Sequence, residues 1–261
     1  MSLTDFAENK LLNLTLKNTA WTVASGSTYL GLMTAAPNEN GTTNNEVSAA
    51  WYARKQPTSG WNVATTTGIT NNGASTWSSV TGSSVTVSHV GLFDALSGGN
   101  LLWYIALTSP KLFGVGGTPN IGNALLNITV PTGGISNFLI PKWLDHMTGR
   151  AAYSPSASVY LAMYTSNPTA ADSGTEIVIG TGGYARQAIT FSTATTGTTS
   201  NSADISFGTA SASLGNISHY GIKTAVTAGS LLLFGAWNSI LTVDNGDTYK
   251  CLSGQLTQNL D

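Results

Sequence analysis

The chain has 261 residues with ten Lys or Arg against twelve Asp or Glu, so 8 % are charged, whereas about 25 % is typical of soluble domains. This balance leaves no basic surplus for binding nucleic acid, and no apolar run approaches the roughly 18 residues of a membrane span. Thr, Ser, Asn and Gly are abundant, and a hydrophobic fraction of 41 % is enough to form a core. The composition therefore favours an all-β protein with a Thr- and Ser-rich surface.

The first predicted element is a short helix over residues 3–16, with apolar side chains at helical spacing and Ser2 or Thr4 as its N-cap. Short apolar runs between Gly-rich turns then predict antiparallel strands. Pro and Gly mark residues 131–135 as a linker. A second helix over residues 136–147, capped by Ser136 or Asn137, opens another strand-rich half. The strands are predicted at 29–33, 85–87, 90–93 and 101–107, and then at 159–164, 203–207, 217–222 and 231–236.

The two halves of the chain are copies of one module. Residues 27–37 align with residues 158–168, and the matches continue to residues 101–102 and 231–232 with an offset near 130 residues. A period of this length is typical of a duplicated domain rather than a solenoid of short repeats. We predict a first module over residues 1–130 and a second over residues 136–261, each a β-sandwich or jelly-roll-like fold preceded by a short helix.

The ends of the chain and its cysteine content bear on where the protein is made. Residues 1–8 are acidic where a signal peptide needs a basic segment followed by an apolar one. The single cysteine, Cys251, excludes an intramolecular disulfide. We therefore expect synthesis in a cytosol and release by lysis rather than export through a signal peptide.

A Glu, a Tyr and an Arg recur at matched positions in both modules. In a chain so poor in charge, these residues either form an internal bridge that orients a strand or direct the Arg toward a neighbouring subunit, because its planar fork suits both tasks. We favour the internal structural role because both modules retain the residues. They are Glu46, Tyr52 and Arg54 in the first module and Glu176, Tyr184 and Arg186 in the second.

Each module also contains a Ser-His dipeptide, Ser88-His89 and Ser218-His219. Adjacent residues on a strand point to opposite faces, so we expect neither pair to act as a nucleophile and its base. The second module has Lys223 and Thr224 where a triad needs an acid. We predict that each His is structural and satisfies a loop carbonyl, and that the chain is not an enzyme.

The remaining chemistry-bearing residues predict no cofactor and no metal site. Three His, one Cys and a turn at residues 244–247 lack the spacing of metal ligands. Seven Trp raise the alternative of sugar binding. Trp77 aligns with Phe207 and Trp61 with Phe191, as interchangeable core aromatics do, so most Trp are predicted to lie in the core. Trp51 has no aromatic counterpart, since Gly183 aligns there, and is the candidate for an exposed interface residue.

The order of these motifs resembles a module of tailed-bacteriophage virion proteins that are labelled tail-fibre or head-decoration proteins. The motifs are Tyr-Leu-x-x-x-Thr-x-x-Pro, Tyr-Ala-Arg-Gln, Ser-Asn-Ser-Ala-x-Ile-x-Phe, Ser-His-x-Gly-Ile and Gly-x-Leu-Leu-Phe, and the second half carries them almost throughout. The first half departs from them, with Lys55 in place of the Gln and residues 71–74 in place of Ser-Asn-Ser-Ala. The resemblance implies a virion structural protein and brings no catalytic residues.

Two virion roles follow from this resemblance. We favour a capsid decoration (cement) protein that binds the outer surface of the major capsid protein as a trimer, because the chain lacks a collagen-like shaft or heptads. The alternative is a tail fibre or tail-tip component that adsorbs to the host, with a surface glycan as a partner. A glycan-cleaving enzyme is disfavoured because no pair of carboxylates stands out.

Overall fold

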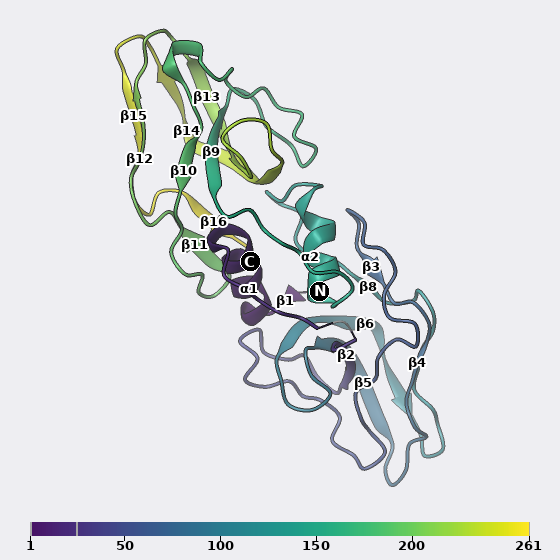
Figure 1. Cartoon of the computed structure of the whole chain (residues 1–261). Coiled ribbons are helices and arrows are strands. Elements are labelled where there is room, and N and C mark those ends of the chain that lie inside the picture. Colours follow the sequence, from purple (N-terminus) through teal and green to yellow (C-terminus); the bar gives the residue numbers. More distant parts are fainter. Residues whose placement is uncertain (1, 25, 261) are drawn as a thin grey trace. The chain divides into compact units, whose positions relative to one another are not determined.

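The computed structural model describes residues 2–24 and 26–260 (Figure 1). Strands dominate, and one α-helix precedes the strands of each half, α1 (Asp5–Lys17) and α2 (Leu139–Met147). The predicted all-β fold with a helix before each half is confirmed. No helix in the described ranges is long and apolar enough to cross a membrane.

The chain divides into two compact units, and both helices are shared between them. Unit 1 consists of Met1–Leu11, Trp21–Val130 and Pro141–Tyr153, and unit 2 consists of Leu12–Ala20, Pro131–Ile140 and Ser154–Asp261. The N-terminal part of α1 therefore belongs to unit 1 and its C-terminal part to unit 2. For α2 the assignment is reversed, with its C-terminal part in unit 1.

Both helices begin at a hydroxyl cap that also fastens them to a strand. The Thr4 Oγ1 atom accepts a hydrogen bond from the Ala7 N–H at 3.4 Å, and the Ser136 Oγ atom accepts one from the Leu139 N–H at 3.2 Å. The same hydroxyls donate to the carbonyls of Leu101 and Leu231, each at 2.6 Å. Of the two residues predicted for each cap, Thr4 and Ser136 hold the position.

Unit 1 contains a four-stranded antiparallel sheet in the order β1-β6-β5-β2. Its strands are β1 (Ser2–Leu3), β6 (Leu101–Phe113), β5 (Val85–Phe93) and β2 (Tyr29–Met33). Two short ribbons extend the unit, β3 (Ile69–Thr70) with β8 (Asn127–Ile128) and β4 (Ser75–Thr76) with β7 (Asn120–Ile121).

Unit 2 repeats this plan with the sheet order β10-β9-β13-β14. Its strands are β10 (Gln187–Ile189), β9 (Val159–Tyr164), β13 (Gly215–Lys223) and β14 (Leu231–Val243). The ribbons are β11 (Thr198–Ser200) with β16 (Thr257–Asn259) and β12 (Ile205–Thr209) with β15 (Thr248–Cys251), and a 3₁₀ turn, η1, spans Thr181–Gly183. Figure 1 shows β9, β13 and β14 side by side. A jelly-roll topology stays a prediction.

The long hairpin of each unit carries the same irregularity. Pairing shifts between Val87, which faces Lys111, and His89, which faces Ala106. The β13–β14 hairpin shifts between Ile217 and His219 in the same way. Because the ladder resumes beyond the shift, the two strands predicted at 85–87 and 90–93 form one strand, and the strand predicted at 101–107 continues to Phe113.

Candidate functional site

The repeated Glu, Tyr and Arg of unit 1 form one hydrogen-bonded cluster beside β2. Arg54 is 7 % exposed and holds the Glu46 carboxylate in a fork, with its Nε atom 2.8 Å from Oε1 and its Nη2 atom 2.7 Å from Oε2. The Tyr52 hydroxyl donates to Glu46 Oε1 at 2.6 Å and accepts from the backbone N–H of Leu32 at 3.0 Å. Burial, reinforced by the bond to Glu46, raises the pKa of Tyr52 far above its ordinary value, so its hydroxyl stays protonated.

The other edge of the Arg54 guanidinium fixes the loop after β5. Its Nη1 atom donates to the carbonyls of Ala95 at 2.7 Å and Gly98 at 2.6 Å. The guanidinium also lies 3.5 Å from the centre of the Phe93 ring, a cation–π contact. One buried side chain thus ties a carboxylate, an aromatic ring and two loop carbonyls together, a combination that the single ammonium of Lys cannot reproduce.

Unit 2 contains the same cluster at the matched residues. Arg186 binds the Glu176 carboxylate through Nε and Nη2, both at 2.7 Å, and its Nη1 atom donates to the carbonyls of Ala225 at 2.8 Å and Ala228 at 2.5 Å. Tyr184 donates to Glu176 at 3.2 Å and accepts from the Met163 N–H at 2.9 Å. These bonds lie within one unit in both copies.

Each clamped loop presents one aliphatic side chain to solvent. Leu96 lies between the two carbonyls that Arg54 holds and is 55 % exposed. Val226 lies at the matched place in the loop of unit 2 and is 46 % exposed. These two residues were not predicted from the sequence, although they share a signal: an aliphatic residue inside a small-residue turn at the same offset in both copies. The two arginines therefore hold the backbone on both sides of each exposed side chain.

The Ser-His pairs are closer than the sequence analysis expected. The Ser88 hydroxyl lies 2.9 Å from His89 Nδ1, and the Ser218 hydroxyl lies 2.8 Å from His219 Nδ1. The expectation that the two side chains point apart is wrong because the hairpin shifts register at this dipeptide, which breaks the alternation of a regular strand. The partner of each imidazole here is the neighbouring hydroxyl, not the loop carbonyl that was predicted.

In unit 2 the hydrogen bond between Ser218 and His219 runs from the imidazole to the serine oxygen, whereas a catalytic serine donates to its base. The Ser218 hydroxyl donates to the carbonyl of Thr165 at 3.0 Å. Its single proton is thereby used, so the contact with His219 is made by an N–H of the imidazole donating to the serine oxygen. A general base must instead accept the serine proton.

The expectation that Trp51 is exposed is wrong. Its side chain is 8 % exposed and packs edge-on against Tyr52 of the cluster, with ring centres 5.9 Å apart and an interplanar angle of 86°. In the second module the aligned Gly183 ends the 3₁₀ turn η1, so a different local structure stands where the first module has the indole. An interface role for Trp51 stays a prediction.

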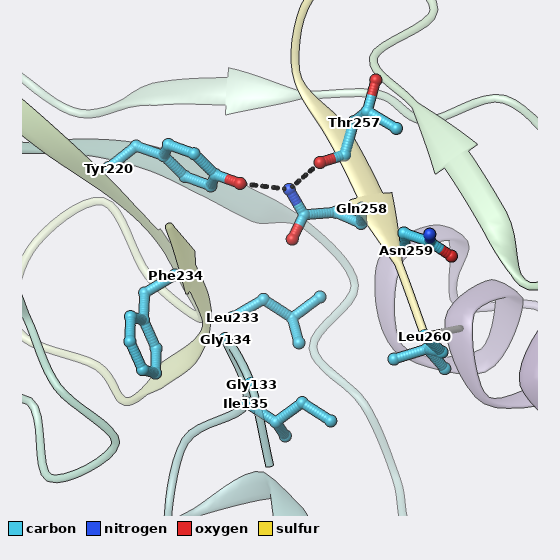
Figure 2. Close-up of a pocket in the computed structure, with 10 residues that line it drawn as sticks. All are labelled: Gly133, Gly134, Ile135, Tyr220, Leu233, Phe234, Thr257, Gln258, Asn259 and Leu260. Atoms are coloured by element: carbon cyan, nitrogen blue, oxygen red, sulfur yellow. Dashed lines mark hydrogen bonds between the residues drawn. The ribbon is translucent and has the colours of Figure 1, made fainter. Parts of the chain in front are cut away.

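A small pocket lies in unit 2 beside β16 (Figure 2). Gln258 crosses it, and its Nε2 atom donates to the Tyr220 hydroxyl at 3.0 Å and to the Thr257 carbonyl at 2.9 Å, as the dashed lines show. Burial raises the pKa of Tyr220. The cavity measures about 100 Å³. Ligand pockets of proteins usually measure about 300–1,000 Å³, so this one is of a size for water rather than for a sugar.

Unit 1 contains a larger polar pocket of about 310 Å³. Gln56, Thr58, Ser59 and Arg150 line it together with Trp61, whose indole N–H donates to Thr28 Oγ1 at 3.2 Å. The Nη1 atom of Arg150 is 3.0 Å from Asp145, and the Arg150 side chain is 30 % exposed. This pocket was not predicted from the sequence because its lining comes from segments that lie far apart in the chain.

The described residues bring no three His, Cys, Asp or Glu side chains together as ligands for a metal ion. Cys251 is a buried free thiol, and burial raises its pKa. Unit 2 does contain a further ion pair that the sequence analysis did not identify, between Lys223 Nζ and Asp172 Oδ2 at 2.5 Å. Lys223 is 4 % exposed, so this pair fastens the end of β13 to the loop after β9.

One family model, described as podophage GP4 fiber I protein gp80, matches the chain twice, over residues 2–129 and residues 134–259. The two matches follow the internal duplication and cover most of the chain. No curated protein matches. The chain therefore belongs to this family and carries two copies of its module in tandem. The predicted resemblance to a tandem-repeat phage virion protein is confirmed, and the chain is a phage structural protein.

Proposed function

We propose that this chain is a fibre component of a tailed-phage virion and that it acts by binding rather than by catalysis. The observation that carries the proposal is the match of both modules to a family described as a fibre protein. That description favours the fibre alternative of the sequence analysis over capsid decoration. Binding to the outer surface of the major capsid protein stays a prediction without support from the comparison.

The surface of the units fits a binding role. The loops held by Arg54 and Arg186 keep Leu96 and Val226 in solvent at fixed positions. Because these loops are ordered before binding, less conformational entropy is lost on association. Only 8 % of the chain is charged, so its contacts with virion partners depend on neutral hydrogen bonds and buried apolar area. These partners include further copies of the chain in a trimer. The affinity of such contacts should respond weakly to salt.

Copy number tests the proposal. Quantitative mass spectrometry of purified virions, referenced to the major capsid protein, should give about three to twelve copies, as the closed symmetry of a tail requires. A count in the hundreds would place the chain on the shell and overturn the fibre assignment in favour of decoration.

A host-surface glycan is the second partner that we propose, on the evidence of the polar pocket in unit 1. Amide and hydroxyl groups of Gln56, Thr58 and Ser59 suit sugar hydroxyls, and Arg150 suits a carboxylated sugar. Full-length protein should bind host envelope polysaccharide, and Arg150→Gln should weaken that binding at least tenfold. The control Lys250→Gln changes an exposed cation of unit 2 and should have no effect. Equal binding by both variants contradicts this pocket as the site.

A further inference from the structure

Each helix has its N-terminal part in the unit that its own repeat forms and its C-terminal part in the other unit. Each N-terminus is fastened to its own repeat: the Thr4 N–H donates to the Leu102 carbonyl at 3.1 Å, and the Ser136 N–H donates to the Leu232 carbonyl at 3.0 Å. The C-terminal part of α1 belongs to unit 2, and that of α2 belongs to unit 1. Each unit is therefore built mainly from one repeat together with the C-terminal part of the helix of the other repeat.

Two hydrogen bonds show that each repeat binds the C-terminal part of the helix of the other repeat. In unit 2 the Asn13 side-chain oxygen of α1 accepts the backbone N–H of Ala194 at 2.9 Å. In unit 1 the Asp145 side-chain oxygen of α2 accepts the backbone N–H of Ala64 at 3.3 Å. Ala64 and Ala194 are matched positions of the duplication, and Asn13 and Asp145 lie at nearly the same offset in the two helices. One contact is thus the copy of the other with the repeats interchanged.

Further contacts lie next to the Asn13–Ala194 and Asp145–Ala64 hydrogen bonds. The Lys17 ammonium at the end of α1 donates to the Phe191 carbonyl at 2.8 Å. After α2, the Thr148 carbonyl accepts the Thr28 hydroxyl at 2.8 Å, and the His146 ring packs against Trp21 with centres 5.3 Å apart. The exchanged parts are also apolar and buried. Leu12, Leu14 and Leu16 are at most 5 % exposed in α1, and Trp143, Leu144 and Met147 are 0 % exposed in α2.

From these observations we infer that residues 61–64 and the matching residues 191–194 are two copies of one pairing surface. The partner of this surface is the C-terminal end of the helix of a second copy of the repeat. Each repeat supplies both the helix end and the surface to which the other helix end binds, and this reciprocity is the defining property of an isologous interface. In this chain the second copy is supplied by the duplication. The linker at residues 131–135 therefore raises the local concentration of one repeat around the other but is not what holds them together.

The test is to cut the full-length chain in its linker. A protease site inserted between Thr132 and Gly133 falls in exposed backbone, and a Cβ added at Gly133 would meet no atom within 4 Å. After cleavage under native conditions, the two fragments should co-elute in gel filtration at micromolar concentration. Separate elution of two folded fragments would overturn the inference.

A pair of variants makes the test specific to this surface. The double variant Asn13→Ala/Asp145→Ala removes both reciprocal acceptors, and its cleaved fragments should dissociate at a concentration at least tenfold higher than that of the parent. The control Asn238→Ala removes an exposed side chain of β14 and should leave dissociation unchanged. Equal dissociation constants for parent, double variant and control would overturn the assignment of the pairing surface. The inference is independent of the fibre proposal, since virion location does not enter these measurements.

Discussion

Removing the guanidinium of Arg54 tests the physical role assigned to the repeated cluster. Arg54→Met keeps an unbranched side chain but removes the guanidinium donors to the Glu46 carboxylate and to the carbonyls of Ala95 and Gly98, so that Glu46 keeps only its bond from Tyr52 within the cluster. Breaking a buried ion pair from one side costs about 3–5 kcal/mol. The side chains are 6 % and 21 % exposed, so Glu46 regains some hydration. We therefore expect a loss at the lower end, about 3 kcal/mol.

Thermal unfolding followed by circular dichroism measures this loss. For a unit of about 130 residues, a loss of about 3 kcal/mol corresponds to a fall in Tm of roughly 11 °C. Arg54→Lys should lose most of the same stability, because an ammonium cannot span the carboxylate and both carbonyls. Arg150→Met is the matched control: its side chain is 30 % exposed in the pair with Asp145, and such surface pairs contribute about 0–1 kcal/mol. If Arg54→Met lowers the Tm no more than Arg150→Met does, the Arg54 cluster does not stabilise unit 1 as described.

Three further predictions concern pH, packing and virion contacts. Burial lowers the pKa of His146, so stability is complete above the unfolded pKa of about 6.5 and falls as the pH drops below it; His146→Gln should flatten that slope in urea titrations, and an unchanged slope contradicts this. A Cβ on Gly91 would lie 2.3 Å from Met33 Cε, so Gly91→Ala should cost about 1–3 kcal/mol of unfolding free energy, whereas Gly114→Ala, with no atom nearby, should be neutral. Leu96→Ser with Val226→Ser should leave the Tm unchanged but lower incorporation into virions in a complementation assay, and full incorporation would count against the loop contacts.

Local pattern was sufficient for the elements whose signal lies in adjacent residues. The strands at Tyr29–Met33 and Val159–Tyr164 match their predicted bounds, because short apolar runs bounded by turns describe buried strands well. The two helices were expected from the spacing of their apolar residues and from their hydroxyl caps. The duplication was visible because it repeats particular residues at a constant offset.

Features that depend on long-range pairing were not accessible in this way. The contact of Ser88 with His89 arises from a register shift against β6, which no property of the dipeptide signals. The burial of Trp51 depends on where Tyr52 is held by Glu46. The division of each helix between two units depends on contacts with segments more than 80 residues away, such as Ala64 with Asp145. Periodicity reports which face of a helix is apolar, but not which part of the chain covers that face.

The most direct test of the fibre assignment is to locate the chain on the virion. An epitope inserted at the exposed turn of residues 40–42 can be labelled with gold-conjugated antibody and viewed by electron microscopy. The account predicts gold at the tail and its fibres, with the rest of the particle unlabelled. Gold distributed over the surface of the head would contradict it.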